Sequence, residues 1–287
     1  MASTIVLKRR IGSIKNTRQI TKAMELVSAS KLRRAQEYAQ RSRDYSDLAT
    51  TMLNRLAAMT EVSRQPLFEE RPIKARLYIV VTSNSGLAGA YNANVLKLLA
   101  KGLQEDRAAK IHSQVITIGS KGAQFVRRIS DVKLVAVYPA LGDRPTANDL
   151  RPVLNTMIRS YEDKTVDNVQ LIYTVYKSAV IQQATVKTML PELAPKEASS
   201  ESYLSNFEPD VETVIEQVTT RLLEAQLWQS VLEGLASEHA MRMVAMKNAT
   251  DNAKDLIDDY TLELNTARQA GITQELAEIT GGAEAMK

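Results

Sequence analysis

No glycine or proline interrupts the chain between Ser13 and Gln65, and this limits the folds that the N-terminal part can adopt. Glycine and proline are the residues that most often end or break a helix, so the stretch predicts one helix, or two helices in line. At about 1.5 Å per residue, roughly fifty helical residues extend about 75 Å, which exceeds the diameter of a small domain. Such a helix cannot bury itself in a core of its own and must reach another element or another protein.

A second long helical segment is predicted from about Pro209 to Ala270, where Gly234 is the only internal glycine. Pro209 suits a first helical turn, and the acidic residues around it complement the positive end of the helix dipole. Apolar and small residues recur along the segment at alternating spacings of four and three: Leu232, Ala236, His239, Met243, Met246, Thr250, Ala253, Ile257, Tyr260, Leu264 and Ala267. This spacing is typical of a coiled-coil seam and predicts a left-handed supercoil with another helix.

The N-terminal helix is the natural partner for this seam. It carries small residues that would allow two helix backbones to approach closely: Ala23, Ser28, Ala29, Ala35 and Ala39. The alternative, a helix buried on all sides, would need a very large domain around it, and the middle section is too short to supply one. We therefore expect the two chain ends to pair antiparallel and to project from the middle section.

The middle section alternates short apolar segments with helical ones. Buried strands rich in β-branched residues are predicted at 76–82, 114–119 and 133–138, and a strand pair at 168–190. Helices are predicted near 92–103, 121–129 and 147–161. Strands that alternate with helices indicate a mostly parallel sheet with right-handed crossovers.

These patterns together predict an α/β fold class. We expect a long antiparallel coiled coil of the N- and C-terminal helices plus a central doubly wound, mostly parallel α/β domain. The expected bounds are residues 1–65 for the N-terminal helix, 73–195 for the central domain and 208–287 for the C-terminal helix.

Positive charge is concentrated at the front of the chain. The sequence has 37 basic and 33 acidic residues, yet residues 1–43 hold eleven basic residues against two acidic ones, a net charge of +9. The remaining 26 basic and 31 acidic residues sum to −5. Such asymmetry favours an acidic partner for the first helix, namely nucleic acid, anionic lipid or a carboxylate-rich protein surface; the alternative is a solvated helix face.

Catalytic and metal chemistry find little support in the sequence. The chain has no cysteine, which excludes disulfides and thiolate chemistry, and its two separate histidines, His112 and His239, are a poor set of metal ligands. A glycine-bearing loop, Thr82 to Asn92, follows the first strand, where doubly wound sheets bind phosphates. It lacks the lysine of a P-loop and the third glycine of a dinucleotide fingerprint. We expect no catalytic residue, no cofactor and no metal.

The sequence also contains no apolar run of the roughly 20 residues that a helix needs to span a bilayer.

Two function classes compete for these features. A nucleic-acid-binding protein would explain the basic first helix, but aromatic residues that could stack on bases are sparse there. A small-molecule-binding α/β protein would explain the middle section, but its loop lacks the side chains that hold a phosphate.

Five segments distributed along the chain read SIKNTRQITKAMELVSASKLRRAQ, SNSGLAG, YTVYKSAVIQ, LASEHAMRMVAMKNATDNA and NTARQAGITQELAEITGGA. They closely resemble the gamma subunit of rotary F-type ATP synthases, in the family's order and over essentially the whole chain. The resemblance implies a non-catalytic rotor shaft, threaded through a ring of alternating alpha and beta subunits. In the family, ions crossing the membrane turn a c-subunit ring, and the shaft then opens and closes three beta-subunit nucleotide sites in turn.

The resemblance also implies partners and a location. The partners are the alpha and beta subunits of the catalytic ring, the epsilon subunit and the c-subunit ring, with no nucleic acid and with membrane association only through these partners. Direct entry into the family's first motif without a transit peptide favours a bacterial protein, peripheral at the cytoplasmic face of the plasma (inner) membrane.

Individual residues match the family's contact positions for the beta subunits. Three match the segment near an acidic lever on each beta subunit: Lys22, Met24 and Glu25. Three match positions that hydrogen-bond a beta-subunit loop near the upper shaft: Arg268, Gln269 and Thr273. Three more suit the same contacts by charge alone: Lys8, Arg9 and Arg10.

A further segment, SYLSNFEPD, resembles the family's foot, which docks on the c ring and the epsilon subunit. The residues that carry this match are Tyr203, Phe207 and Glu208.

Overall fold

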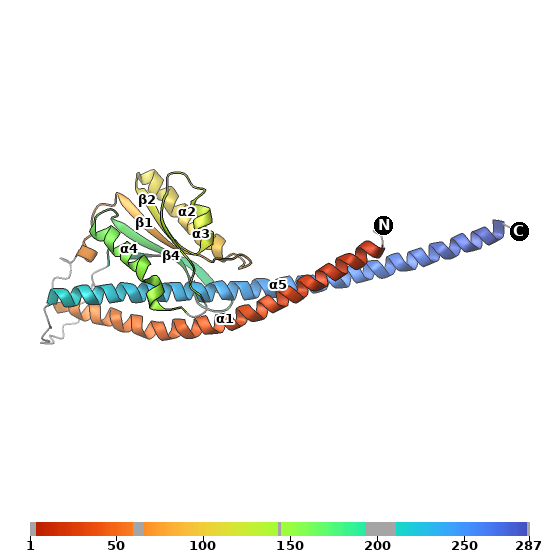
Figure 1. Ribbon diagram of the computed structural model, residues 1–287, viewed down its shortest axis with the longest axis horizontal. Helices are drawn as coiled ribbons and strands as arrows, with labels where there is room; N and C mark the ends of the chain where they lie inside the picture. The colour runs from red at the N-terminus through yellow and green to blue at the C-terminus, as the bar shows by residue number, and fades with distance from the viewer. Residues whose placement is uncertain (1–3, 60–65, 143–144, 193–210, 286–287) are drawn as a thin grey trace. The chain divides into compact units, whose positions relative to one another are not determined.

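The computed structural model describes residues 4–59, 66–142, 145–192 and 211–285 (Figure 1). By its internal contacts the chain divides into two compact units, one formed by Met1–Ser28 with Met243–Lys287 and the other by Ala29–Arg242. Two long helices, α1 (Thr4–Met59) and α5 (Val211–Ala285), each contribute one stretch to each unit.

The larger unit, Ala29–Arg242, contains a five-stranded sheet with the order β3-β2-β1-β4-β5. Its strands are β1 (Ala75–Val81), β2 (His112–Ile118), β3 (Lys133–Tyr138), β4 (Asn168–Tyr176) and β5 (Gln182–Leu190). The first four strands are parallel, and β5 pairs antiparallel with β4. The mostly parallel sheet and its strand pair at 168–190 are therefore confirmed.

Helices cover both faces of this sheet (Figure 1). Residues of β1 alternate between the two faces: Tyr78 and Val80 pack with α2 (Tyr91–Ala109) and α3 (Ser120–Val126), while Ile79 and its odd-numbered neighbours pack with α4 (Arg151–Glu162) and α5. Two short 3-10 helices, η2 (Pro66–Phe68) and η3 (Ala147–Leu150), complete the described elements. Two helical layers around one sheet confirm the doubly wound architecture.

The first third of α5 packs in the hydrophobic core beneath the sheet rather than in a coiled coil. Its apolar residues belong to the same core as the sheet: Ile215, Leu222, Leu223, Leu227 and Val231. The sequence analysis placed the seam from Leu232 onward and did not assign this earlier part to the α/β core. Its apolar face is wide because it packs on a sheet, whereas a seam between two helices is narrow.

Every predicted seam position of α5 is buried or half-buried. Leu232, Ala236 and His239 are buried in the larger unit, and in the smaller unit Met246, Thr250, Ala253 and Ile257 are buried while Met243, Tyr260, Leu264 and Ala267 are half-buried. Thr250 Oγ1 donates a hydrogen bond to Thr21 Oγ1 over 2.8 Å, and the Arg10 guanidinium lies 5.9 Å from the centre of the Tyr260 ring. From Arg10 to Thr21 the residue number rises along α1, while the contacted residue of α5 changes from Tyr260 to Thr250. The two helices of the smaller unit are therefore antiparallel.

The larger unit has the same antiparallel pairing. Arg43 Nη2 lies 3.5 Å from Glu233 Oε1, while Lys31 and Ala35, earlier in α1, line one small gap with His239, later in α5. The expected antiparallel pairing of the chain ends is thus confirmed in each unit by itself.

The α1 side of the seam differs in part from expectation. Ser28, Ala29, Ala35 and Ala39 are buried or half-buried, but Ala23 is exposed, so its assignment to the seam was wrong. One face of α1 carries buried and half-buried residues three, four or, across the exposed Arg18, seven positions apart: Leu7, Ile11, Ile14, Thr21, Glu25, Ser28, Leu32, Ala35, Ala39 and Ser42. Other half-buried residues, such as Met24 and Ala29, flank this face. Ala23 falls two residues after Thr21, on another face of the helix.

Gly234 allows α5 to approach the sheet closely. A Cβ added at this position would lie 3.1 Å from Val81 Cγ1 and 3.3 Å from the Tyr91 hydroxyl. Gly271, in the same helix, has no atom within 4 Å of such a Cβ. The two glycines therefore differ in the space around them although both are helical.

We predict that Gly234→Ala and Gly271→Ala change stability in opposite directions. The added methyl group of Gly234→Ala overpacks the helix–sheet contact by more than it gains in helix propensity, so we expect the free energy of unfolding to fall by about 1 kcal/mol. Gly271→Ala should add roughly 0.5–1 kcal/mol of local helix stability. Urea and thermal unfolding followed by circular dichroism at the helix band measure both; equal stabilisation by the two variants would contradict the close packing of Gly234.

Candidate functional site

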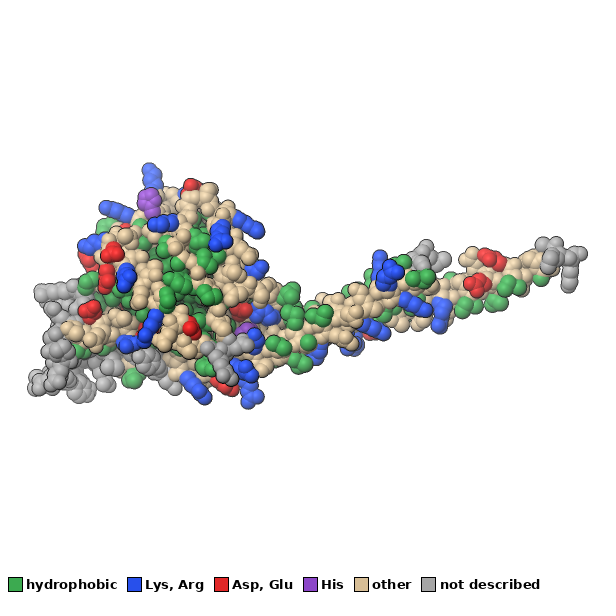
Figure 2. Space-filling model, viewed as in Figure 1, with side chains coloured by type: hydrophobic (Ala, Val, Ile, Leu, Met, Phe, Trp, Pro, Cys, Tyr) green, Lys and Arg blue, Asp and Glu red, His purple; other side chains and the backbone are tan. Residues whose placement is uncertain are grey.

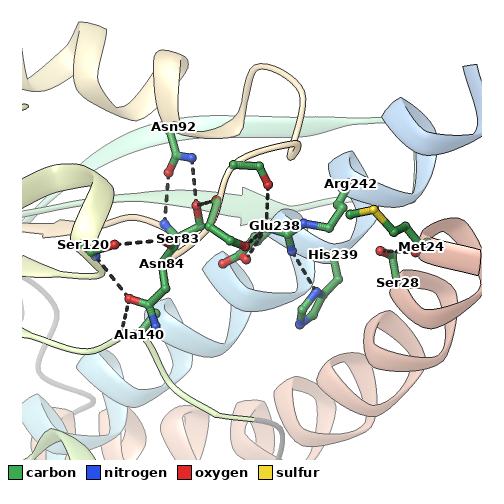
Figure 3. Close-up of polar contacts among 12 residues, drawn as sticks. Met24, Ser28, Ser83, Asn84, Asn92, Ser120, Ala140, Glu238, His239 and Arg242 are labelled. Atoms are coloured by element: carbon green, nitrogen blue, oxygen red, sulfur yellow. Dashed lines mark hydrogen bonds and ion pairs between the residues drawn. The ribbon is translucent and has the colours of Figure 1, made fainter. Parts of the chain in front are cut away.

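The loop after β1 occupies the position where open α/β sheets bind their ligands. The strand order reverses between β1 and β4, and ligands usually lie at the carboxyl ends of strands at such a reversal. In this chain the polar groups of the loop bond to the domain itself. The Ser83 amide donates to Asn92 Oδ1 over 3.0 Å, and Asn84 Oδ1 accepts from the amides of Ser120 and Ala140, each over 3.2 Å (Figure 3).

Helix α5 crosses this end of the sheet. Arg242 Nη2 donates to Ser85 Oγ over 3.2 Å and lies 3.5 Å from the Gly86 carbonyl oxygen. Ser237 Oγ donates over 3.2 Å to the carbonyl oxygen of Thr174, near the end of β4. Together with the close contact of Gly234 against β1, these bonds place α5 where a small-molecule ligand would otherwise lie.

The charged groups at this position pair with each other. Arg242 Nη2 lies 2.8 Å from Glu238 Oε1, both side chains are only 10% exposed, and Arg242 Nη1 lies 3.4 Å from His239 Nδ1 (Figure 3). Burial raises the pKa of the Glu238 carboxyl, while the Arg242 and Lys31 charges oppose that shift. Burial also raises the pKa of the Tyr91 hydroxyl well above its usual value. The charges of Glu238 and Arg242 therefore compensate each other within the chain.

Other site classes find no support in the part of the chain that the structure describes. Within residues 4–59, 66–142, 145–192 and 211–285, no three histidine or carboxylate side chains gather in a way that could hold a metal ion. Over the same ranges, each helix is either too short or too polar to pass through a bilayer.

The residues matched to an acidic lever lie in the smaller unit on α1. Lys22 is exposed, and its ammonium group lies 3.0 Å from both carboxylate oxygens of Glu25, which is half-buried on the seam side. Met24 is half-buried, and its carbonyl oxygen accepts a 2.7 Å hydrogen bond from Ser28 Oγ (Figure 3). The structure thus brings Lys22 and Glu25 together and leaves the Met24 side chain partly accessible.

The second matched set lies farther along α5 in the same unit. Arg268, Gln269 and Thr273 are all exposed, and the Thr273 hydroxyl donates to the Gln269 carbonyl oxygen over 2.9 Å. Because Thr21 pairs with Thr250, Arg268 stands eighteen residues beyond the level of Thr21, or roughly 27 Å along the helix. The two sets are therefore separate stations on the paired helices and do not form one site.

The residues assigned by charge alone are exposed on the first turns of α1. Lys8, Arg9 and Arg10 all face solvent, and Arg10 also stacks near Tyr260. Figure 2 shows Lys and Arg side chains spread over the surface of the paired helices, with hydrophobic side chains between them. The foot residues Tyr203, Phe207 and Glu208 lie outside the described residues.

Exposed apolar residues of the smaller unit were not singled out by the sequence analysis. Ile272, Leu276 and Ile279 are 51%, 58% and 69% exposed and recur at i, i+4 and i+7, so they form one stripe on α5. The described part of α1 begins at Thr4, and after Gly271 every described side chain of α5 is exposed. The signal was present in the sequence, because these apolar residues depart from the spacing of the seam.

Known proteins resemble the chain over its whole length. The family model described as ATP synthase matches residues 3–286. The ATP synthase gamma chains of Xylella fastidiosa (strain M12) and Desulfitobacterium hafniense (strain DSM 10664 / DCB-2) are 40% and 39% identical to it, over 290 and 288 residues that cover 100% of each chain.

Two solved structures have a similar fold. The rotor of the Euglena gracilis mitochondrial ATP synthase in rotational state 1 matches with a TM-score of 0.65 at 19% identity, covering 94% of this chain and 98% of that one. The central stalk and c ring structure of the Tetrahymena thermophila mitochondrial ATP synthase matches with a TM-score of 0.64 at 22% identity, covering 80% and 99%.

We predict that the purified chain binds ATP only weakly, because α5 bonds to the loop after β1 and this loop, Thr82 to Asn92, contains no lysine. Isothermal titration calorimetry with magnesium and ATP should give no saturable heat at micromolar ligand. A dissociation constant in the micromolar range would contradict this reading of the crevice.

Proposed function

Because the chain belongs to the ATP synthase gamma chain family, we propose that it is the central-stalk rotor subunit, which transmits torque between an ion-driven c ring and three catalytic beta subunits. Rotation in one direction drives ATP synthesis, and ATP hydrolysis drives rotation and ion pumping in the other. The subunit is not itself an enzyme, since ATP is made and hydrolysed on the beta subunits. Its partners are the alpha and beta subunits, the epsilon subunit and the c-subunit ring.

The observation that carries this proposal is the seam of the two long helices. Eleven predicted positions of α5, from Leu232 to Ala267, are all buried or half-buried, and the helices are antiparallel in each unit. Two packed helices resist bending and twisting far better than a single strand or loop. Because the two helices differ in sequence, each side of the pair presents a different surface to a neighbouring protein.

A rotating pair of helices with different surfaces on its sides can change the conformation of neighbouring proteins. A partner that exists in several conformations shifts toward the one that the facing surface binds best. When an asymmetric shaft turns, each of three identical partners meets each surface in succession. We therefore infer that the chain acts through differential contact with the beta subunits rather than through chemistry of its own.

We propose two stations for the beta-subunit contacts. The first is Lys22, Met24 and Glu25, where exposed charge and a partly accessible methionine could meet an acidic lever, with Lys8, Arg9 and Arg10 adding positive charge nearer the start of α1. The second is the exposed set Arg268, Gln269 and Thr273 on α5. The stripe of Ile272, Leu276 and Ile279 beyond it suits a low-friction apolar bearing, because its contacts are spread and non-directional.

The remaining parts of the proposal rest on the family. We propose that Tyr203, Phe207 and Glu208 belong to the foot that contacts the c ring and the epsilon subunit, within a chain organised as 1–65, 73–195 and 208–287. We further propose that the protein is peripheral at the cytoplasmic face of a bacterial plasma (inner) membrane. The bacterial sources of the similar gamma chains support that location.

Copurification tests the proposed function directly. An affinity-tagged chain expressed in its native cells should bring down a stable complex with three copies each of two larger subunits. Native mass spectrometry gives that stoichiometry. Recovery of the chain alone, or bound to nucleic acid that high salt removes, would contradict the proposal.

We predict that Met24→Lys lowers coupling more than it lowers assembly. A lysine here would add an ion pair with an acidic lever, and this pair would hold the shaft in one position. Ions pumped per ATP hydrolysed, measured in membrane vesicles, should fall about twofold or more. Met24→Leu, which is uncharged and of similar volume, is the matched control and should couple normally. Equal coupling ratios for the two variants would contradict the lever contact.

A further inference from the structure

Arg242 is a buried arginine whose hydrogen bonds reach two different elements. Its guanidinium lies 2.8 Å from Glu238 Oε1 on its own helix and 3.2 Å from Ser85 Oγ on the loop after β1, with the Gly86 carbonyl oxygen 3.5 Å away (Figure 3). Arginine stays charged inside a protein, so it needs a counter-charge and partners for its fork of donors. Glu238 supplies the counter-charge, the loop supplies Ser85 Oγ and the Gly86 carbonyl oxygen, and His239 Nδ1 lies 3.4 Å from Arg242 Nη1.

The free energy of unfolding gives only a weak reason for burying Glu238 and Arg242 as an ion pair. Apolar residues of similar size are often as stabilising as a buried ion pair, because both charges lose their hydration. What a buried ion pair adds is direction, since its hydrogen bonds form only in one arrangement of the groups. The pair therefore selects one position of the loop relative to α5.

The loop is held firmly from its other side as well. Asn92 and Asn84 bind it to α2 and to the segments that follow β2 and β3. Within the loop, Leu87 has a φ of 60°, a left-handed conformation that a leucine keeps only when its surroundings fix the backbone. The loop is thus a rigid connection between the sheet and the side chain of Arg242.

The position of Arg242 along α5 determines where this connection resists rotation of the helix about its axis. Before it, α5 packs on the sheet through apolar residues such as Leu223, Leu227 and Val231. Apolar packing is non-directional and resists rotation of a helix about its axis less well than directed hydrogen bonds do. Arg242 is the last residue of the unit Ala29–Arg242, so its bonds to the loop are made where α5 leaves that unit.

We propose that Arg242, oriented by Glu238, is a positioning residue that pins α5 to the loop after β1, so that torque on the α/β domain passes into the helix instead of twisting it against the sheet. This inference rests on the proposed rotor function. It concerns a role inside the chain, separate from the surfaces that meet the beta subunits.

The test uses the complete synthase in membrane vesicles with three variants of the chain. In Glu238→Met/Arg242→Met the buried charges are replaced by apolar side chains of similar length, which avoids an unpaired buried charge. Arg242→Lys keeps the ion pair but lacks the fork that serves Glu238 and the loop together. Arg221→Met removes an exposed partner of Glu224 on the same helix and is the matched control.

Two measurements are made on each assembled complex. Hydrogen exchange at the amides of residues 85–88 should become about tenfold faster in the double variant and should be unchanged in Arg221→Met. Ions pumped per ATP hydrolysed should fall about twofold or more in the double variant, at an unchanged maximal rate of hydrolysis. A loss of folding stability alone would lower the yield of complex without changing this ratio.

Each outcome decides between support and rejection. Normal coupling and normal exchange in the double variant overturn the inference. If the double variant does not assemble, Arg242→Lys takes its place, and normal coupling and exchange in that variant overturn the inference equally. A failure of the proposed function differs from both, because the unmodified chain would then form no complex with coupled pumping.

Discussion

The narrow seam between α1 and α5 is the constraint on which the rest of the structure depends. In the smaller unit the two helices have no sheet to pack on, and long helices alone are only marginally stable in water. Their stability must come from burying one stripe against the other. The stripe contains small and polar residues such as Ser28, Thr21 and Thr250, and the last two share a buried hydrogen bond. Close approach and directed bonding thus compensate for the small apolar area.

The same helix meets different demands in the two units. In the larger unit α5 is part of the core beneath a twisted sheet, and residues as bulky as Leu222 and Leu227 are fully buried. In the smaller unit, beyond Thr250, only every third or fourth described residue of α5 is buried or half-buried. Helix α5 is continuous from Val211 to Ala285 and has a different burial pattern in each unit. That continuity is what a shaft requires if it is to transmit rotation.

The crevice at the end of β1 and β4 has the position of a ligand site in an open α/β fold, but in this chain it holds part of α5. Open α/β sheets generally hold a ligand at this position. Here Ser237 and Arg242 of α5 supply polar partners to β4 and to the loop after β1, and Glu238 pairs with Arg242. The α/β domain therefore holds α5 in place instead of a ligand. This explains how an architecture associated with nucleotide binding serves a subunit without catalysis.

The sequence by itself determined the two long helices, the alternation of strands and helices, and the seam of α5, because absent helix breakers and regular spacings are local properties of the chain. It also identified the family through motifs spread along the whole chain. Tertiary structure alone decided that Ala23 faces solvent, since the rotation of α1 about its axis depends on which partner residues it meets. It alone brought Arg242 to Ser85, 157 positions apart in the chain, because a contact between distant segments follows from how the sheet, the loop and α5 pack, and no local pattern records it.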